Sequence, residues 1–158
     1  MIWLKKVIFI SSTGGHLSEL LKLKKVMKRY ESYLVTEETE TTKGLSFAWI
    51  KKVFYLTYGT RFHFSYLYKF PYNCFKSLKI FLKVKPDVIV TTGAHTAVPM
   101  CYIAKLFRRK VIYIETMANI KTKTLTGKLV YPIADVFIVQ WESMLKLYPK
   151  AVLGGWIF

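Results

Sequence analysis

The sequence predicts an α/β fold, a Rossmann-like doubly wound parallel sheet formed by a single domain over residues 1–158. Short apolar runs alternate with segments of helical spacing along the whole chain, as in a parallel sheet with crossover helices. Two of these runs, at 7–10 and 88–92, lead through glycine-containing turns directly into helical segments. With 158 residues, of which 53% are hydrophobic and 16% aromatic, the chain can bury a full core.

The first half of the chain is expected to form three strands and two helices. The strands are predicted at 6–10, 32–36 and 52–56, and the helices at 15–29 and 73–84. A polar loop at 37–42 follows the second strand, at the sheet edge where ligand-contacting loops lie in open α/β folds.

The second half continues the alternation. Strands are predicted at 88–92, 111–115, 136–139 and 151–153. Between them we expect a helix that follows the turn at 93–99 and ends near Phe107, a short helix at 127–133, and a last helix that ends at Leu147.

The chain is strongly basic, with a formal net charge of +16. Such a charge favours an anionic partner, which can be nucleic acid, anionic lipid or a phosphorylated substrate. Cys74 and Cys101 form no disulfide framework and belong to no Cys/His cluster, so we expect buried thiols in a reducing compartment and no metal site. The apolar run near the N-terminus is too short for a transmembrane helix, so we interpret it as the first strand.

The first glycine turn, Ser11-Ser12-Thr13-Gly14-Gly15-His16, is the main candidate site. Two adjacent glycines allow backbone N–H groups to approach a ligand, and the N-terminus of the following helix favours negative charge. His16 can titrate or donate a hydrogen bond there. The turn matches neither G-x-G-x-x-G nor a P-loop, and an ordinary tight turn beside an exposed histidine fits it equally well.

A second turn, with Gly93, His95 and Thr96, also follows a strand end. Glu115 and Gln140 come at the ends of two further predicted strands. Because the carboxyl ends of parallel strands meet at one edge, these residues and His16 are expected to line one crevice. For Glu115 a ligand contact is favoured over a helix cap.

Residues 61–85 combine lysines with many aromatic residues, and no Asp or Glu occurs from Thr41 to Pro86. A basic face beside an aromatic and aliphatic face is typical of a helix that lies in a membrane interface. A core helix with a solvated lysine face is the alternative for 73–84. The residues predicted to associate with the membrane are Arg61, Phe62, Phe64, Lys69, Phe70, Lys76, Lys79 and Lys83.

Five motifs in order resemble one known family. They are Ser-Ser-Thr-Gly-Gly-His-Leu at 11–17, Thr-Gly-Ala-His-Thr-Ala-Val-Pro at 92–99, Ile-Tyr-Ile-Glu-Thr at 112–116, and two stretches at 125–135 and 137–142. They resemble the accessory subunit of two-component polysaccharide β-1,4-glycosyltransferases of bacterial capsule and exopolysaccharide synthesis. The eukaryotic relative of that family recruits the UDP-GlcNAc transferase of dolichol-linked glycan synthesis to the membrane.

The resemblance implies the N-terminal half of a GT-B glycosyltransferase on its own polypeptide. Such a subunit binds a polyprenyl-pyrophosphate-linked acceptor and an anionic membrane surface, while a UDP-sugar-binding partner supplies the C-terminal half. It implies a heterodimer that is active only as a complex, attached peripherally at the cytoplasmic face of the plasma membrane. We expect no counterpart of the transmembrane helix of the eukaryotic relative, and the chain is expected to end where a donor domain would begin.

The expected reaction is an inverting sugar transfer, with His16 as the first candidate for the base and Glu115 as the second. Acceptor binding is predicted at Thr13, Gly14, Gly15, Gly93, His95 and Thr96, and the partner interface at Gln140, Trp141 and Trp156. No Asp-x-Asp motif occurs, so no metal or other cofactor is expected.

Two other functions remain open from the residues alone. The charge and the interleaved aromatic residues allow a nucleic-acid-binding module, although we predict no nucleic acid as partner. A self-contained nucleotide-binding Rossmann protein is disfavoured because G-x-G-x-x-G and an acidic residue closing the second strand are both missing from the predicted pattern.

Overall fold

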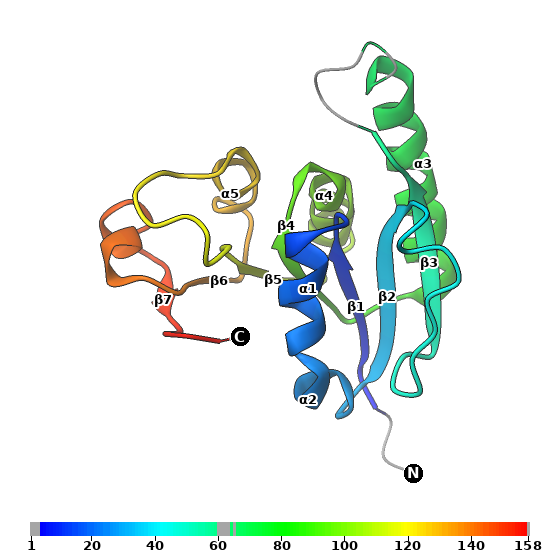
Figure 1. Cartoon of the computed structure of the whole chain (residues 1–158), viewed down its shortest axis with the longest axis horizontal. Helices are drawn as coiled ribbons and strands as arrows, with labels where there is room; N and C mark the ends of the chain where they lie inside the picture. Colours follow the sequence, from blue (N-terminus) through cyan, green and yellow to red (C-terminus); the bar gives the residue numbers. More distant parts are fainter. Residues whose placement is uncertain (1–3, 60–63, 65, 158) are drawn as a thin grey trace.

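The computed structural model describes residues 4–59, 64 and 66–157. Its centre is a seven-stranded sheet in the order β3-β2-β1-β4-β5-β6-β7, in which every neighbouring pair is parallel (Figure 1). The order starts in the middle and winds outward in both directions, which confirms the predicted doubly wound fold. The strands are β1 (Lys6–Ser11), β2 (Glu31–Glu38), β3 (Lys52–Thr57), β4 (Val88–Gly93), β5 (Lys110–Ile114), β6 (Val136–Val139) and β7 (Val152–Leu153).

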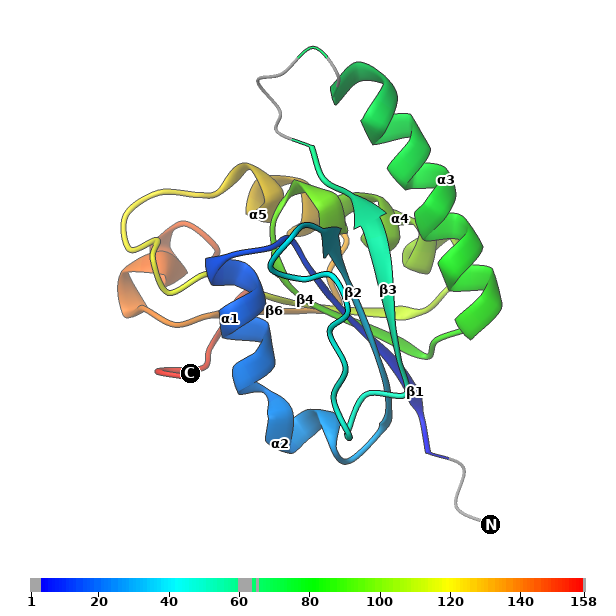
Figure 2. The same cartoon turned by 45° about the vertical axis from the view of Figure 1, so that its right-hand side comes forward.

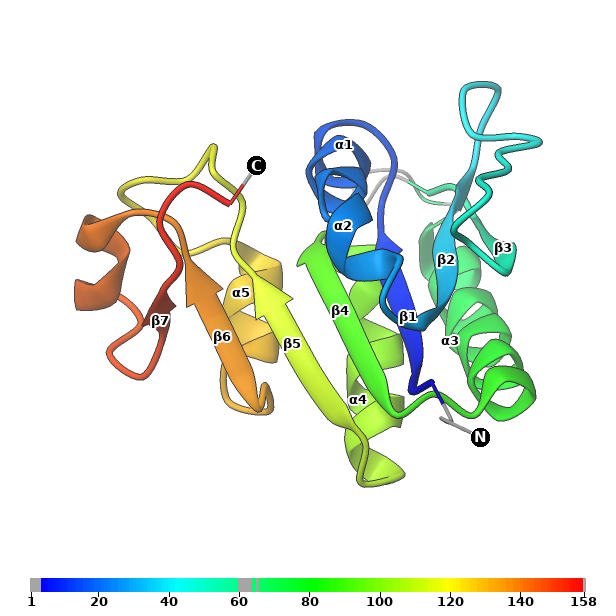
Figure 3. The same cartoon turned by 90° about the horizontal axis from the view of Figure 1, so that it is seen from below.

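Helices cover both faces of the sheet (Figures 2 and 3). On one face lie α1 (Gly15–Lys22) and α2 (Lys24–Met27), and on the other lie α3 (Tyr66–Val84), α4 (Val98–Leu106) and α5 (Leu125–Val130). Two 3₁₀ helices, η1 (His95–Ala97) and η2 (Glu142–Lys146), complete the fold.

The central strand β1 explains why both faces need helices. Its side chains alternate, so that Phe9 packs with α1 and α2 while Ile8 and Ile10 pack with α3 and α4. All three are fully buried. A strand buried on both faces is a continuous apolar run, and this accounts for the pattern in the sequence.

Some predicted boundaries were wrong. The helix predicted at 15–29 is interrupted at Leu23, whose backbone (φ −74°, ψ 14°) closes α1 and whose side chain is buried. Neither proline nor glycine marks this break, so packing of Leu23 into the core decides it. The last predicted helix is the 3₁₀ helix η2, and the helix predicted at 127–133 is α5, which begins earlier.

The helix predicted to begin at residue 73 begins at Tyr66 and contains Pro71. Asn73 fixes this helix to the edge strand: its Oδ1 accepts from the Thr57 N–H and its Nδ2 donates to the Thr57 carbonyl, both at 2.8 Å. These bonds satisfy the backbone of Thr57 on the outermost strand, where ladder groups would otherwise lack partners.

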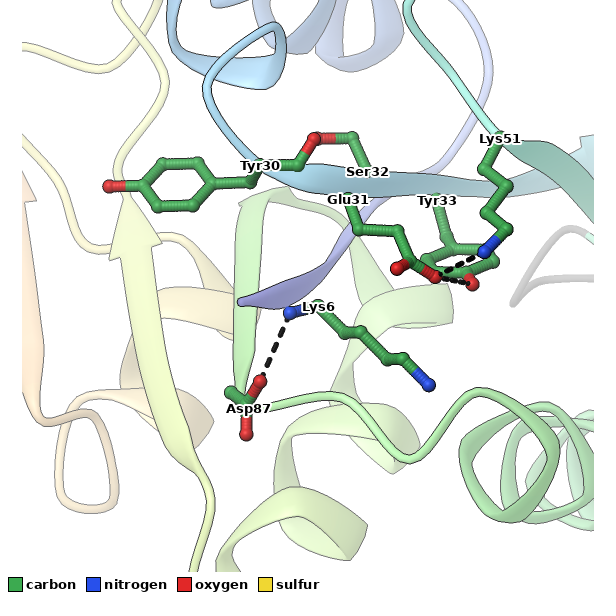
Figure 4. A network of polar contacts seen from close by, with 7 residues as sticks. All are labelled: Lys6, Tyr30, Glu31, Ser32, Tyr33, Lys51 and Asp87. Atoms are coloured by element: carbon green, nitrogen blue, oxygen red, sulfur yellow. Dashed lines mark hydrogen bonds and ion pairs between the residues drawn. The ribbon is translucent and has the colours of Figure 1, made fainter. Parts of the chain in front are cut away.

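A polar network joins the strands at their amino ends (Figure 4). The Lys6 backbone N–H donates to Asp87 at 3.0 Å. Lys51 Nζ lies 2.6 Å from Glu31 Oε1, which also accepts from the Tyr33 hydroxyl. The hydrogen bond from Lys51 lowers the pKa of Glu31. The network holds the amino edge of the sheet, opposite the edge where the two glycine turns lie.

The two cysteines are free thiols, and Cys101 is fully buried whereas Cys74 is half-buried. Burial raises the pKa of Cys101 to about 12. A thiol held protonated in this way is a poor nucleophile, which agrees with the structural role expected for Cys101.

Candidate functional site

A cavity of about 160 Å³ lies at the carboxyl edge of the sheet, beside the ends of β1, β4 and β5. His16 comes from the start of α1 and His95 from η1, so the two glycine turns do meet as expected. The remaining lining residues come from the turn after β4, from β5 and from the start of α5: Ala94, Tyr113, Thr124, Leu125 and Thr126.

His16 is held in one tautomer by the neighbouring strand end. Its Nδ1 lies 2.8 Å from the Thr92 carbonyl oxygen, and the Thr92 hydroxyl donates to the His16 carbonyl at 2.8 Å. Because a carbonyl can only accept, Nδ1 carries the proton and the neutral ring leaves Nε2 unprotonated. An imidazole in this state can accept a proton from a hydroxyl group.

Position 93, in the second turn, requires glycine because the backbone there passes close to His16. Gly93 has φ +98°, and a Cβ there would lie 3.3 Å from the Tyr113 hydroxyl and 3.4 Å from His16 Cε1. The Gly93 carbonyl also accepts from the Ser12 N–H at 3.3 Å, which joins the two turns. Gly14 (φ +76°) is the N-cap of α1, and within the described part of the chain no side chain caps this helix end. The free N–H groups of the first turn of α1 can therefore bind an anionic ligand.

Glu37, which the sequence placed in the polar loop at 37–42, belongs to β2 and was not predicted as a site residue. Its buried carboxylate accepts from the Thr13 N–H at 3.3 Å and from the Thr96 hydroxyl at 2.8 Å, so it joins the two turns from β2. The prediction that no acid closes the second strand was wrong, because β2 continues to Glu38. Val35-Thr36-Glu37 prolongs the apolar strand without a turn residue, and that signal favours the longer strand.

Glu115 lies just past β5 and is only 1% exposed. Its carboxylate accepts from the hydroxyls of Thr124 (3.0 Å), Tyr148 (3.0 Å) and Tyr113 (3.4 Å) and from the Thr116 N–H (3.2 Å). Burial raises the pKa of Glu115, and these hydrogen bonds oppose the rise. Tyr113 and Thr124 both line the cavity, so Glu115 orients two of the hydroxyls in the cavity wall.

Glu115 caps none of the described helices; Thr124, its hydrogen-bond partner, caps α5 instead. Thr124 is the N-cap of α5, and its side chain accepts from the Gly127 N–H at 2.9 Å. A Cβ at Gly127 would collide with Glu115 Oε2 and with the Tyr148 hydroxyl. The glycine therefore makes room for the carboxylate and its partners. Among the described residues, no group of three His, Cys, Asp or Glu side chains could hold a metal ion.

The residues predicted to contact a partner lie at the β7 end of the sheet. Gln140 is buried and donates through Nε2 to the Glu115 carbonyl at 3.0 Å. Trp141 donates to the Met117 carbonyl at 2.8 Å, and its ring meets Trp156 edge to face with 6.0 Å between centroids. Trp156 is 68% exposed, whereas Trp141 is half-buried.

The described residues among those predicted to associate with the membrane lie at the opposite end, on and near α3. Phe64, Lys79 and Lys83 are exposed, while Lys69, Phe70 and Lys76 are half-buried. Arg61 and Phe62 lie outside the described residues. In the described part of the chain, no helix has the length and apolar character that crossing a membrane requires.

The structural comparisons reveal the same fold in larger enzymes. Acinetobacter baumannii MurG superposes with a TM-score of 0.68 at 16% identity, over 88% of this chain and 42% of MurG. UDP-N-acetylglucosamine 2-epimerase from Rickettsia bellii superposes with a TM-score of 0.71 at 16% identity, over 92% of this chain and 41% of that chain. The chain thus spans about two fifths of these solved structures, and the likeness confirms the Rossmann-like, GT-B-type fold.

The sequence comparisons identify the family. The UDP-N-acetylglucosamine transferase subunit ALG14 of Rattus norvegicus is 26% identical over 189 residues, covering 94% of this chain and 81% of the relative. The subunit of the same name from Schizosaccharomyces pombe is 28% identical over 174 residues, covering 96% and 82%. The family model described as "Oligosaccharide biosynthesis protein Alg14 like" matches residues 6–157. The chain therefore belongs to the Alg14-like family of oligosaccharide biosynthesis proteins.

Proposed function

We propose that this chain is the acceptor-side subunit of a two-component glycosyltransferase in capsular polysaccharide, exopolysaccharide or lipid-linked oligosaccharide biosynthesis. It binds a lipid-pyrophosphate-linked acceptor and recruits a separate UDP-sugar-binding subunit to the membrane. The observation that carries the proposal is the cavity where His16, whose Nδ1 donates to the Thr92 carbonyl, lies beside the open N-terminus of α1. Support comes from relatives that match along most of their length and are named subunits of UDP-N-acetylglucosamine transferase.

The proposed chemistry assigns each group a separate task. His16 Nε2 takes the proton of the acceptor hydroxyl, whose oxygen attacks C1 of the donor sugar while the bond from C1 to the nucleoside diphosphate breaks. The N–H groups of Gly14 and Gly15 face the acceptor pyrophosphate. Glu115 is a positioning residue in this scheme, because its hydrogen bonds fix Tyr113 and Thr124 at the cavity wall.

In the proposed assembly the two ends of the sheet meet different partners. The basic, aromatic α3 at the β3 end attaches peripherally to the cytoplasmic face of the plasma membrane. The β7 end, with Trp141 and the exposed Trp156, meets the UDP-sugar-binding subunit. The acceptor cavity lies between them at the carboxyl edge, so both partners can reach it.

The test is a transfer assay with a lipid-linked acceptor and a radiolabelled UDP-sugar, with and without the partner subunit. We expect transfer only by the complex, and a fall of about 10²- to 10⁴-fold in kcat for His16→Ala. His16→Gln keeps a donor for the Thr92 carbonyl but has no basic nitrogen, and Lys22→Ala is the control at the exposed C-terminal end of α1.

Each part of the proposal has its own contradicting outcome. Full activity of the isolated chain would exclude a two-component enzyme. Full activity of His16→Ala in the complex would exclude His16 as the base. Activity retained by His16→Gln but lost in His16→Ala would assign His16 the task of orienting the acceptor instead.

A further inference from the structure

A second hollow, of about 290 Å³, lies between the edge strand β3 and the helix α3, away from the His16 cavity. Figures 1 and 2 show α3 running alongside β3 at the end of the sheet. Lys52 from β3 and Lys76, Lys79 and Lys83 from α3 surround a floor that includes Phe54 and Ile80. We call this hollow the lysine groove.

The periodicity of the two elements brings these side chains together. Lys76, Lys79 and Lys83 recur at helical spacing, beside the buried Ile80 that fixes α3 to the sheet. Lys52 and Phe54 are two residues apart on β3 and so lie on one face of the strand. The groove is therefore built on two regular elements.

Within the described residues, no carboxylate forms an ion pair with the lysines of the groove. Neither β3 nor α3 contains an acidic residue. Lys52 and Lys76 instead lie over the rings of Phe54 and Tyr72, each at 5.4 Å from the centroid. Four like charges around one hollow repel each other, so an anionic occupant relieves the repulsion.

An exposed apolar stripe runs along α3 beside the lysines. Phe75 is 63% exposed and Leu82 is 47% exposed. On α4, which packs against α3, Leu106 is 79% exposed. A ligand that pairs with the lysines of the groove and also covers the apolar stripe carries a phosphate next to long apolar chains.

We propose that the lysine groove binds the phosphate headgroup of an anionic glycerophospholipid, whose acyl chains extend over the apolar stripe of α3. This inference rests on the proposed function, because it requires the chain to work at a membrane surface. It replaces a diffuse attraction to anionic lipid by a discrete, saturable site.

The probe is dihexanoyl phosphatidylglycerol below its critical micelle concentration, titrated into the full chain and followed by the methyl NMR signal of Ile80. We expect saturable shifts, and binding weakened about 30-fold in the double variant Lys52→Gln/Lys79→Gln. The matched control, Lys22→Gln/Lys25→Gln, removes the same charge from exposed positions of α1 and α2 on the other face of the sheet. It should bind within about twofold of the unmodified chain.

Equal weakening in both double variants would overturn the proposal, because a diffuse field would then explain binding. Equally tight binding of glycerol 3-phosphate would overturn the assignment to a lipid, and equally tight binding of dihexanoyl phosphatidylcholine would overturn the need for net negative charge. The transfer assay with a detergent-dispersed acceptor separates this inference from the proposed function. Lipid binding without transfer by the complex would contradict the proposed function alone, and transfer without saturable lipid binding would contradict the groove alone.

Discussion

At the scale of single residues, the site depends on glycines that leave room for their neighbours. Gly93 leaves room for His16 and Tyr113 beside the second turn, and Gly127 allows Glu115 and Tyr148 to meet beneath α5. Such requirements cannot be recognised in the sequence, because the atoms concerned belong to different elements. The sequence placed Gly93 and His16 at one edge, but it did not indicate that Tyr113 lies against Gly93 or that Tyr148 lies against Gly127.

Gly127→Ala should lower the free energy of unfolding by about 1–3 kcal/mol, because the added Cβ displaces Glu115 or Tyr148 in a packed network. Urea denaturation followed by far-UV circular dichroism measures the change. Gly15→Ala is the control, since a Cβ there meets no atom within 4 Å and its φ is not positive. It should leave the free energy of unfolding unchanged or raise it by up to about 1 kcal/mol. Similar losses in both variants would contradict this account.

Glu115 should make stability depend on pH. Burial raises its pKa, so the folded protein holds this proton more tightly than the unfolded chain does. The contribution of protonated Glu115 to the stability of the fold is therefore complete below the ordinary Glu pKa of about 4.3. This contribution is lost as the pH rises through the raised pKa of Glu115 in the folded protein. Urea midpoints measured at several pH values should show this fall in the unmodified chain and a smaller one in Glu115→Gln. Parallel profiles for the two proteins would exclude Glu115 as the source.

At the scale of elements, the sequence predicted the strands well and the helices less well. Buried strands such as β1 and β4 are continuous apolar runs between turn residues, so their positions follow from local pattern. Local pattern does not predict the break between α1 and α2 at Leu23 or the continuation of α3 through Pro71. Packing against the sheet decides both. The end of β2 was placed too early, and Glu37 was missed for that reason.

Glu37→Ala should lower the free energy of unfolding by about 1–3 kcal/mol and lower kcat of the complex, because the Thr13 N–H and the Thr96 hydroxyl lose their acceptor. Glu38→Ala removes the same charge from an exposed neighbour and should have little effect on either measurement. A Glu37→Ala variant as stable and as active as Glu38→Ala would show that the two turns need no connection from β2.

At the scale of the whole molecule, the net charge of +16 should make membrane association sensitive to salt. Binding to vesicles of phosphatidylcholine with phosphatidylglycerol should fall at least about tenfold between about 0.1 and 0.5 M NaCl, because the Debye length shortens from about 10 Å. Pure phosphatidylcholine vesicles should bind weakly, through exposed apolar side chains such as Phe75. Co-sedimentation measures both, and binding that does not change with salt would contradict an electrostatic attachment.

The sequence by itself determined the fold class, the two glycine turns at one sheet edge, the family and the basic, aromatic character of α3. Each of these follows from local pattern or from motifs in order along the chain. Only the tertiary structure decided that Glu115 is buried behind Thr124, that Glu37 joins the two turns, and that four lysines from two elements enclose one groove. The physical reason is that burial, hydrogen-bond partners and the clustering of charge depend on residues far apart in sequence, and these meet only when the sheet is assembled.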